Sequence, residues 1–481
     1  MAPIPLDDTP PDTPAVTDDL MAFLGSFRSL AQLAERAQGA GTGVRLGTIV
    51  ADFLGGAIAD MAIVSEEVPS HRYADWDKAL GMLAEQDADG RELGVSGGEM
   101  RFHHSLSDFL GDQATHFTVG QVDYISVPIG PDERRRAIGH GIRLYRYRNA
   151  AVGVLQRQAN RRYGQEYGTI EVIAPDRELA AALVEEAREL ATEHSVLRGQ
   201  VVTFDETGFG AESGGMAFLP RPEVTAEQVV LPASSLERIE RHVTGVAEHA
   251  EVLRRHGQHL KRGLLLYGPP GTGKTHTVRH LMHRNPGHTV VVLTGMGLRF
   301  VSTAAAIARA LQPAIVVLED VDLIAEDRSM GQGANPLLFE ILDAMDGLDA
   351  DADVTFLLTT NRVETLERAL VQRPGRVDLA VEIPLPDAAG RLQLLRLYAG
   401  DVAYSPEALV AAAQRTEGVT ASFTKELMRR AVLEAAVAGA EPGDDHLRAA
   451  LDGLLGDREA TTRALLGHAG AGPLGFGNGA G

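Results

Sequence analysis

The stretch GLLLYGPPGTGKTHTV, from Gly263 to Val278, decides the fold of this chain. Leu264 to Tyr267 is a short apolar strand, and Gly268 to Thr275 then fits the phosphate-loop pattern G-x-x-x-x-G-K-[ST]. Glycines let a backbone wrap closely around phosphate, and successive N–H groups then point inward at a helix N-terminus. The stretch therefore predicts a nucleotide site between a strand and a helix of a parallel sheet.

The loop supplies most of the predicted ligands. Lys274 would reach the β- and γ-phosphates of ATP, and the Thr275 hydroxyl would bind Mg²⁺. The residues that we expect to contact ATP are Gly268, Pro269, Pro270, Gly271, Thr272, Gly273, Lys274, Thr275 and His276.

Two further strands are predicted to end in polar side chains. Ala314 to Leu318 is an apolar run that ends in Glu319 and Asp320, and Val354 to Thr359 is followed by Thr360 and Asn361. Carboxylates beside the phosphate loop are what Mg²⁺ and an attacking water require. We therefore expect Glu319 and Asp320 to be catalytic candidates and the strand tip at Asn361 to lie next to the γ-phosphate.

Two arginines follow the third strand, in the sequence QRPGRVD. Arg373 and Arg376 are either ordinary surface charges or fingers that reach the phosphate of a neighbouring subunit. A finger of this kind contributes orders of magnitude in rate, so both residues are catalytic candidates.

Composition shifts divide the chain into segments, and the alternation of short strands with helices in one of them indicates a parallel α/β sheet. The predicted segments are a disordered acidic and proline-rich tail (1–20), an α+β region that selects a client or partner (21–205), a linker (206–222), the α/β nucleotide-binding domain (223–386), a helical lid (387–458) and a glycine-rich tail (459–481).

Periodicity predicts several elements before the linker. Leu46 to Val64 is the most apolar long stretch, but Asp52 and Asp60 within it favour a buried or amphipathic helix over a membrane span. The other expected elements are helices at Leu20–Ala37 and Arg177–His194 and strands at Phe117–Ile129, Thr169–Ala174 and Gln200–Phe204.

The bulk composition excludes several classes of protein. The 481 residues include no cysteine, so disulfides and thiolate metal sites are excluded, and no H-E-x-x-H occurs, so a zinc peptidase of that type is not expected. The first residues lack the pattern of a secretory signal, and with no membrane span we expect a cytoplasmic protein. A net charge of −21 repels phosphate backbones and makes nucleic acid a possible but disfavoured partner.

One segment departs from this acidic balance. Between Arg134 and Arg162 there are nine arginines and no acid, with Tyr145, Tyr147 and Tyr163 interleaved or adjacent. Arginine with tyrosine suits phosphate contact and base stacking, and arginine equally suits carboxylates within the chain, in another subunit or in a protein partner. We favour pairing within the protein, then a protein partner, then nucleic acid.

Taken together, residues 225 to 450 resemble the AAA family of P-loop ATPases. GPPGTGKT is the form that the phosphate loop takes in this family, and VVLEDVD stands where the family has an apolar strand followed by Asp-Glu-x-Asp. TTN at 359–361 is similar to the family's first sensor, RVETLERALVQRPGRVD to its second region of homology, and EGVTASFTKEL to the start of its lid helix. Residues 21–205 resemble no family that we recognise.

The resemblance implies a P-loop α/β domain with a helical lid and a homo-oligomeric ring, usually a hexamer, with ATP at the subunit interfaces. It implies that Lys274 and Thr275 hold ATP and Mg²⁺, that Asn361 positions the attacking water, and that Arg373 and Arg376 act on the next subunit's ATP.

The sequence departs from the family at three places. The metal-side Asp is Glu319 here and the water-polarising Glu is Asp320, so either the strand shifts, or the two residues exchange roles, or hydrolysis is slow. One extra residue lies between Asn361 and Arg373, which a turn can absorb. Phe300-Val301-Ser302 replaces the aromatic–hydrophobic–Gly triplet of threading motors, and Phe300 is either a pore aromatic or, as we favour, part of the core.

These features lead to one preferred function and two alternatives. We expect an oligomeric, Mg²⁺-dependent AAA ATPase that remodels or unfolds an unknown protein client in the manner of a chaperone. A nucleic-acid-acting ATPase would use the Arg/Tyr-rich segment, and a slow ATP-gated scaffold or switch would explain the exchanged acids.

Overall fold

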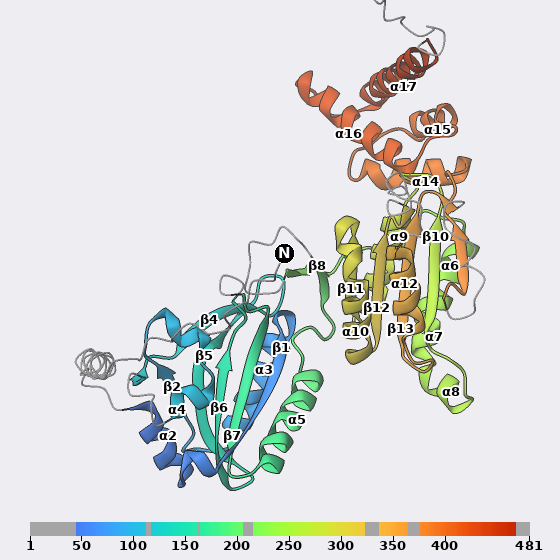
Figure 1. Ribbon diagram of the computed structural model, residues 1–481. Helices are drawn as coiled ribbons and strands as arrows, with labels where there is room; N and C mark the ends of the chain where they lie inside the picture. The colour runs from blue at the N-terminus through green and yellow to red at the C-terminus, as the bar shows by residue number, and fades with distance from the viewer. Residues whose placement is uncertain are drawn as a thin grey trace, which may run out of the picture. The chain divides into compact units, whose positions relative to one another are not determined.

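The computed structural model describes residues 45–111, 117–160, 164–204, 215–322, 336–363 and 376–467. The chain forms two compact units. Unit 1 comprises Met1–Val127 and Arg135–Ala191, and unit 2 comprises Pro128–Arg134 and Thr192–Gly481 (Figure 1). The predicted tail (1–20) and the predicted helix Leu20–Ala37 lie outside the described residues.

Unit 1 is an antiparallel sheet with helices on both faces. The strand order is β1-β7-β6-β5-β2-β3, and β4 pairs with β5. Apolar side chains of α3 and α5 pack against one face, and those of α2 and α4 pack against the other. The elements are α2 (Leu46–Leu54), β1 (Ala62–Pro69), α3 (Tyr73–Ala84), β2 (Arg91–Val95), α4 (Leu106–Leu110), β3 (Val119–Gly120), β4 (Asp123–Pro128), β5 (Arg134–Tyr147), β6 (Ala150–Arg157), β7 (Tyr167–Ala174) and α5 (Arg177–Glu193).

Two predictions for unit 1 were wrong in extent. The stretch Leu46–Val64 is not one helix, because α2 ends at Gly55 in the left-handed region (φ 72°) and the chain enters β1 at Ala62. The predicted strand Phe117–Ile129 is interrupted between β3 and β4. At α2 the apolar run continues past Gly55, which ends the helix locally although the composition does not change.

Unit 2 contains a mostly parallel sheet in the order β14-β10-β13-β12-β11-β8-β9. All of its paired strands run parallel except β8 and β9. Its strands are β8 (Val201–Phe204), β9 (Met216–Leu219), β10 (Arg262–Tyr267), β11 (Thr289–Thr294), β12 (Ala314–Glu319), β13 (Val354–Thr360) and β14 (Leu379–Glu382). The carboxyl ends of β10, β12 and β13 therefore meet at one edge of the sheet, as the sequence predicted for a P-loop α/β fold.

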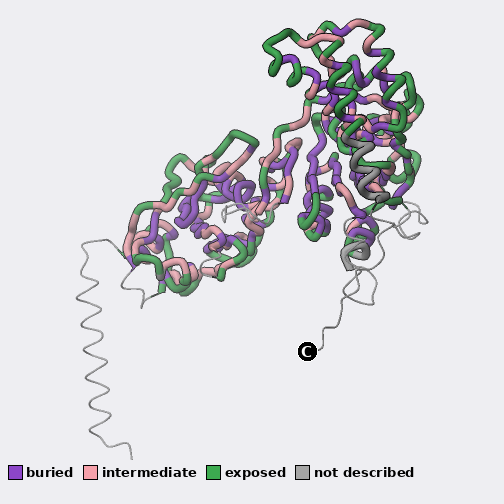
Figure 2. The backbone as a smooth tube through the Cα atoms, turned by 90° about the horizontal axis from the view of Figure 1, so that it is seen from above, coloured by how far each residue is buried: buried purple, intermediate pink, exposed green. Residues whose placement is uncertain are grey.

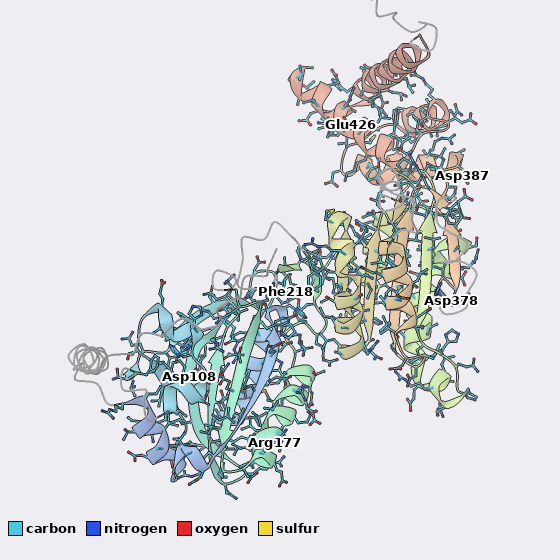
Figure 3. The ribbon with its side chains drawn as sticks, in the orientation of Figure 1. Asp108, Arg177, Phe218, Asp378, Asp387 and Glu426 are labelled. Carbon is cyan, nitrogen blue, oxygen red and sulfur yellow. The ribbon has the colours of Figure 1, made fainter. Side chains whose placement is uncertain are left out.

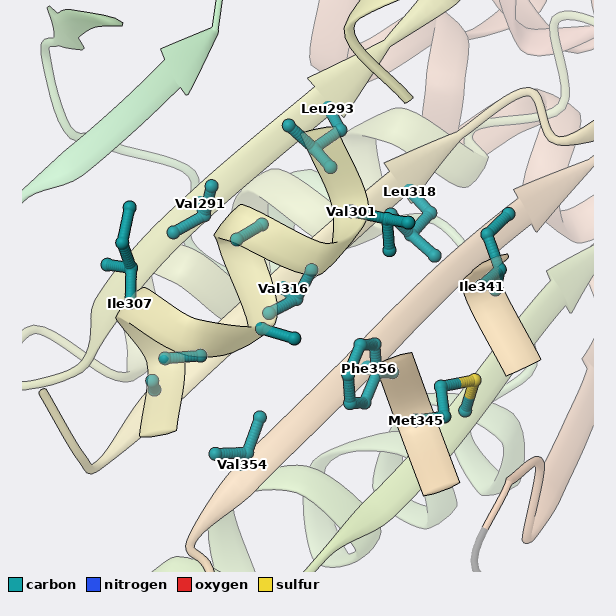
Figure 4. Packing of buried hydrophobic residues seen from close by; sticks show 14 of the residues in the cluster. Val291, Leu293, Val301, Ile307, Val316, Leu318, Ile341, Met345, Val354 and Phe356 are labelled. Carbon is teal, nitrogen blue, oxygen red and sulfur yellow. The ribbon is translucent and has the colours of Figure 1, made fainter. Parts of the chain in front are cut away.

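Helices cover both faces of this sheet. α10 (Val301–Ala310) and α12 (Pro336–Asp346) pack on one face through a cluster that includes Val301, Met345 and Phe356 (Figure 4). α9 (Lys274–Arg284) packs on the other face with the segment around Ile239 and Val243. Because both faces are covered, the central strands are buried along their length (Figure 2). Their near-continuous apolar sequences follow from this burial.

The boundary between the N-terminal region and the nucleotide domain was predicted incorrectly. Gln200–Phe204 was assigned to the N-terminal region and 206–222 to a linker, but β8 pairs with β11 and β9 pairs with β8, so both strands extend the sheet of unit 2. Arg221, within the predicted linker, donates hydrogen bonds to the carbonyl oxygens of Met282 (2.7 Å) and His288 (2.8 Å). These pairings depend on contacts that are distant in sequence, and the Gly/Ser-rich composition of the stretch does not reveal them.

Four helices follow the sheet: α14 (Ala388–Ala399), α15 (Pro406–Arg415), α16 (Ala421–Val437) and α17 (Asp444–Gly467), which share a core of their own. α17 continues to Gly467, so the first residues of the predicted glycine-rich tail (459–481) are helical, and residues 468–481 lie outside the described residues. Among the residues that the structure describes, no helix is long and apolar enough to span a membrane.

Candidate functional site

The phosphate loop connects β10 to α9 at the carboxyl edge of the unit 2 sheet. Two glycines are required by its backbone. Gly268 has φ 142°, and a Cβ at that position would lie 2.3 Å from the carbonyl oxygen of Ile383. Gly273 has φ 114° and is the N-cap of α9. The loop therefore presents the free N–H groups of a helix N-terminus, where a phosphate group is favoured.

Lys274, at the first position of α9, is 6 % exposed. Its ammonium group donates to the carbonyl oxygens of Gly268 (2.8 Å) and Pro269 (2.9 Å) and to Asn361 Oδ1 (2.7 Å). These are the acceptors among the described residues, and all three are uncharged. Burial lowers the pKa of Lys274, while the charges of Asp320 and Asp322 oppose that shift. The site thus holds a buried cation with acidic groups near it but hydrogen bonds only to neutral oxygens.

Glu319 ends β12 beside the first turn of α9. Burial raises the pKa of the Glu319 carboxyl, and a hydrogen bond with the Thr275 side chain opposes that shift. The predicted metal ligands Thr275 and Glu319 are therefore neighbours. A hydroxyl and a carboxylate oxygen are ligands that suit Mg²⁺, so this pair fits the predicted metal site.

Asp320 has an unusual backbone conformation for a residue other than glycine. Its φ is 51°, in the left-handed region. The Thr359 Oγ1 atom accepts a hydrogen bond from the Asp320 N–H (2.9 Å), and the Thr359 carbonyl accepts one from Val321 (3.0 Å). Such a conformation costs about 1–3 kcal/mol and persists only where surrounding contacts impose it. Here the next strand of the sheet imposes it on a predicted catalytic residue.

Asn361 connects the loop to the acidic strand. Its Nδ2 atom donates to Asp320 Oδ1 (3.3 Å), and its backbone N–H donates to Asp322 Oδ1 (3.1 Å). Asp322 is 6 % exposed and also accepts from the Thr360 hydroxyl (3.0 Å). Asp322 thereby fixes the end of β13 from which Asn361 projects.

The lid reaches the phosphate loop at Gly271. The backbone N–H of Ser422, in the first turn of α16, donates to the Gly271 carbonyl (3.1 Å), and the Ser422 hydroxyl lies 3.3 Å from the same oxygen. His276 lies near a different segment, with its Nε2 atom 3.1 Å from the Gln228 carbonyl oxygen. The predicted loop residues are thus bordered by the lid and by the segment that precedes α6 (Ala233–Glu240).

Arg376 does not join this group of residues. It precedes β14 and lies next to Gly263 at the amino end of β10, whereas the phosphate loop follows the carboxyl end. β10 has six residues, so the two ends are about 15–20 Å apart. In Figure 3, Asp378 marks the amino end of β14 and Asp387 the lid side.

The guanidinium of Arg376 forms a two-pronged ion pair with Asp346, at 3.0 and 2.6 Å, and this pair raises the pKa of Arg376. Arg376 therefore lies far from the phosphate loop of its own chain. Arg373, the other predicted finger, lies outside the described residues.

The Arg/Tyr-rich segment of unit 1 is paired internally. Arg143 donates to Asp77 (2.9 Å) and Glu92 (3.2 Å). Tyr145 is fully buried, and the Tyr147 hydroxyl donates to Glu186. Further ion pairs join Arg135 to Asp77, Arg146 to Asp89, Arg148 to Glu186 and Arg157 to Glu171. Arg161, Arg162 and Tyr163 lie outside the described residues. Of the three interpretations, the structure favours pairing within the chain.

The replacement for the pore triplet packs inward. The Phe300 ring stacks on the Phe204 ring with centroids 5.0 Å apart, and Val301 is fully buried. Both residues contact the core between the sheet and α10. This packing favours the interpretation of Phe300 as a core residue.

The fold and the site together define the class of domain. A parallel sheet that presents a phosphate loop, a carboxylate-ended strand and a polar strand tip at one edge is a P-loop nucleoside-triphosphatase domain. Residues 264–385 match the family model described as "ATPase family associated with various cellular activities (AAA)". The chain therefore carries an AAA ATPase domain, and the resemblance predicted from its motifs is confirmed, as is the class of ATP hydrolase for this domain.

Curated relatives match a longer segment. The proteasome-activating nucleotidase of Methanoculleus marisnigri is 34% identical over 205 residues, covering 40% of this chain and 50% of the relative. The ATP-dependent zinc metalloprotease FtsH 3 of Sphaerobacter thermophilus is 33% identical over 284 residues, covering 56% of this chain and 58% of the relative. The chain thus spans about half the length of the curated relatives it matches.

The sequence analysis missed three residues that support the site. Asp322 and Thr359 stand within the motifs that were quoted, but their hydrogen bonds cross from one strand to the next. Ser422 stands within the motif for the lid helix, and only folding brings it to Gly271. The sequence signal that could have found Asp322 is its position, because it is a further acidic residue after Glu319 and Asp320 at the end of a buried strand.

Proposed function

We propose that this chain hydrolyses ATP in an Mg²⁺-dependent manner as a homo-oligomeric ring, a hexamer as the family suggests, and uses the reaction to remodel a protein client. The observation that carries the proposal is the convergence of Lys274, the Thr275–Glu319 pair and the Asn361–Asp320 pair at one sheet edge. These groups supply a phosphate contact, a metal ligand pair and a carboxylate for an attacking water.

Each residue has a role that its position supports. Lys274 would neutralise charge on the β- and γ-phosphates, and Thr275 with Glu319 would hold Mg²⁺, which would neutralise further phosphate charge. Asp320 is our candidate to polarise the water, because it lies one residue beyond the metal-side Glu319 and is held toward Asn361. Asn361 would then orient the same water. Catalysis of this kind rests on positioning and charge neutralisation.

The proposed oligomer is supported by the position of Arg376. Arg376 is too far from the phosphate loop of its own chain, so any contact with nucleotide must occur in a neighbouring subunit. We propose that Arg376 and Arg373 approach the neighbour's phosphate in this way. The distance between the two ends of β10 supports this arrangement over action within one chain.

The client is proposed to be a protein that unit 1 selects, with the chain in the cytoplasm. Two of the relatives are named for activating a proteasome and for ATP-dependent proteolysis, which suggests protein clients. Nucleic acid is less well supported because Arg143 and Arg157 of the Arg/Tyr-rich segment are engaged with carboxylates. A slow switch remains the second candidate, favoured by the strained backbone of Asp320 at the exchanged acid pair.

The test is ATP turnover by the purified full-length chain against protein concentration, with light scattering to give the mass in parallel. We expect the specific activity to rise as the oligomer forms, since a neighbour's arginine must complete each site. ATP binding with background turnover at every concentration would instead favour the slow switch. Loss of oligomer formation with unchanged specific activity would contradict the role of the arginines.

A further inference from the structure

The three hydrogen bonds of Lys274 leave its ammonium group fully engaged. A lysine ammonium carries three donors and no acceptor. Gly268, Pro269 and Asn361 each accept one of these hydrogen bonds, at 2.7 to 2.9 Å. For Lys274 to contact a phosphate, at least one of the three bonds must break. Two acceptors belong to the loop itself, and the third belongs to a different strand.

The orientation of the Asn361 amide follows from its two partners. Lys274 can only donate, so the Asn361 oxygen faces it, and the Asp320 carboxylate accepts, so the amide nitrogen faces that group. Rotating the amide by 180° would place two donors together at Lys274 and two acceptors together at Asp320. Asn361 therefore bridges the phosphate-binding cation to the candidate catalytic carboxylate in a single direction.

The backbone on both sides of this bridge is fixed. The Asn361 N–H is bound to Asp322, whose carboxylate also accepts from the Thr360 hydroxyl. The Asp320 N–H is bound to the Thr359 side chain. With the main chain held, the bridge can open only through the side chains of Lys274 and Asn361. The opening is thus confined to the groups that touch nucleotide.

We propose that the Lys274–Asn361–Asp320 bridge is an autoinhibitory latch that couples nucleotide entry to release of the catalytic carboxylate. In the latched state Asn361 competes with phosphate for Lys274 and also engages the Asp320 carboxylate. When Lys274 turns to a phosphate, the Asn361 Oδ1 atom no longer accepts a hydrogen bond from Lys274. Both Asn361 and Asp320 then become available for water. The latch rests on the proposed ATPase function and adds a second role for Asn361.

The latch makes an unusual prediction, because removing a site residue should strengthen binding. In Asn361→Ala, Lys274 no longer gives up a hydrogen bond to Asn361 when it meets phosphate. A hydrogen bond to a charged group is stronger than one between neutral groups, and phosphate replaces only part of it, so we expect Kd to fall about three- to tenfold. Turnover of the same variant should fall, since Asn361 also orients water in the proposed mechanism.

The experiment is equilibrium binding of fluorescent mant-ATP to the full-length chain in EDTA, which prevents hydrolysis and isolates affinity. Wild type, Asn361→Ala and the control Gln258→Ala are compared, because Gln258 is an exposed amide whose side chain bonds only its own loop in the described structure. Asn361→Leu, which keeps the volume and removes the hydrogen bonds, replaces the Ala variant if thermal unfolding shows that the latter is poorly folded.

A lower Kd for both Asn361 variants, with Gln258→Ala at the wild-type value, supports the latch. An unchanged or higher Kd overturns it while leaving the proposed function intact. If wild type and Lys274→Ala bind mant-ATP equally, the proposed function fails and the latch fails with it, so the two failures are distinguishable.

Discussion

Lys274 of unit 2 and the buried arginines of unit 1 are held in different ways. In unit 1, Arg143 is paired with Asp77 and Glu92, and Arg157 with Glu171, so each charge has a carboxylate partner within the fold. In unit 2, Lys274 is equally buried but bonds only to two carbonyls and an amide among the described residues. A buried charge is costly unless an opposite charge compensates it. Lys274 is therefore prepared for an anionic ligand, whereas the arginines of unit 1 are part of the structure.

The comparison also explains why a charge-rich sequence is a poor guide to a binding surface. The Arg/Tyr-rich segment has the composition of a nucleic-acid site, but β5 is buried over most of its length. Arg143 of β5 pairs with Asp77 of α3, and Arg148, just beyond β5, pairs with Glu186 of α5. The phosphate loop contains a single basic residue, and it is the one whose surroundings suit a phosphate. Burial and partner type separate the two cases.

The largest effect is expected for Lys274→Ala. Removing the cation should abolish ATP binding, because no other cation at the loop is predicted to contact the β- and γ-phosphates. Titration with mant-ATP measures the effect, with thermal unfolding as the test of folding. A variant with normal affinity would contradict the assignment of the site and the contrast between the two units.

The second effect concerns Arg376. In the assembled protein, Arg376→Ala should leave ATP binding intact and reduce turnover about 10³-fold, as arginine fingers do. Because Arg376 also pairs with Asp346, the variant Asp346→Ala serves as the control: it breaks the same ion pair and retains the arginine. If the two variants lose turnover equally, the ion pair and not the finger accounts for the loss.

The third effect tests the structural charges of unit 1. Asp77→Ala removes a buried carboxylate that accepts from Arg143, Gln156 and the Ile138 N–H. Because Arg143 would keep only the more exposed Glu92 of these two carboxylate partners, the protein should be destabilised by about 3 kcal/mol. Denaturant unfolding would measure this, and mant-ATP affinity below the transition should stay at the wild-type value. A loss of ATP affinity in the folded variant would contradict the separation of roles between the units.

The fourth effect is on pH dependence. Burial raises the pKa of Glu319, so its carboxyl takes up a proton at a higher pH than usual. Since a metal ligand must be deprotonated, the Mg²⁺ requirement for turnover should rise as the pH falls through this raised pKa, by about tenfold per unit below it. Mg²⁺ titrations of the ATPase rate from pH 8 to 5 measure the effect. In Glu319→Gln, whose side chain does not titrate, the dependence should be absent.

The smallest effect is expected with nucleic acid. Because Arg135, Arg143, Arg146, Arg148 and Arg157 of the Arg/Tyr-rich segment pair with carboxylates within the chain, we expect the full-length protein to show no salt-dependent binding to a DNA duplex. Fluorescence anisotropy in 20–200 mM salt tests this. Salt-dependent binding that is lost in Arg146→Ala and Arg148→Ala would instead favour the nucleic-acid alternative, since both residues are the more exposed members of the segment.

The sequence alone determined the phosphate-loop domain. Lys274, Thr275, Glu319, Asp320 and Asn361 stand at the ends of strands or at the start of a helix, and the parallel sheet that their spacing predicts brings such positions to one edge. Glycine and apolar patterns are local, so they can be read from neighbouring residues. The AAA resemblance and the ATP-hydrolase class followed from these motifs and were confirmed by the family match.

Only the tertiary structure decided how the remaining groups are used. The extension of the sheet by β8 and β9, the pairing of the arginines in unit 1, the separation of Arg376 from its own phosphate loop and the bridge through Asn361 all join residues that are far apart in sequence. Charge, burial and hydrogen-bond partners arise from that packing, and composition does not contain them. The sequence identifies a basic residue. Whether that residue binds a ligand or stabilises the fold depends on which oxygen atoms the folded chain places beside it.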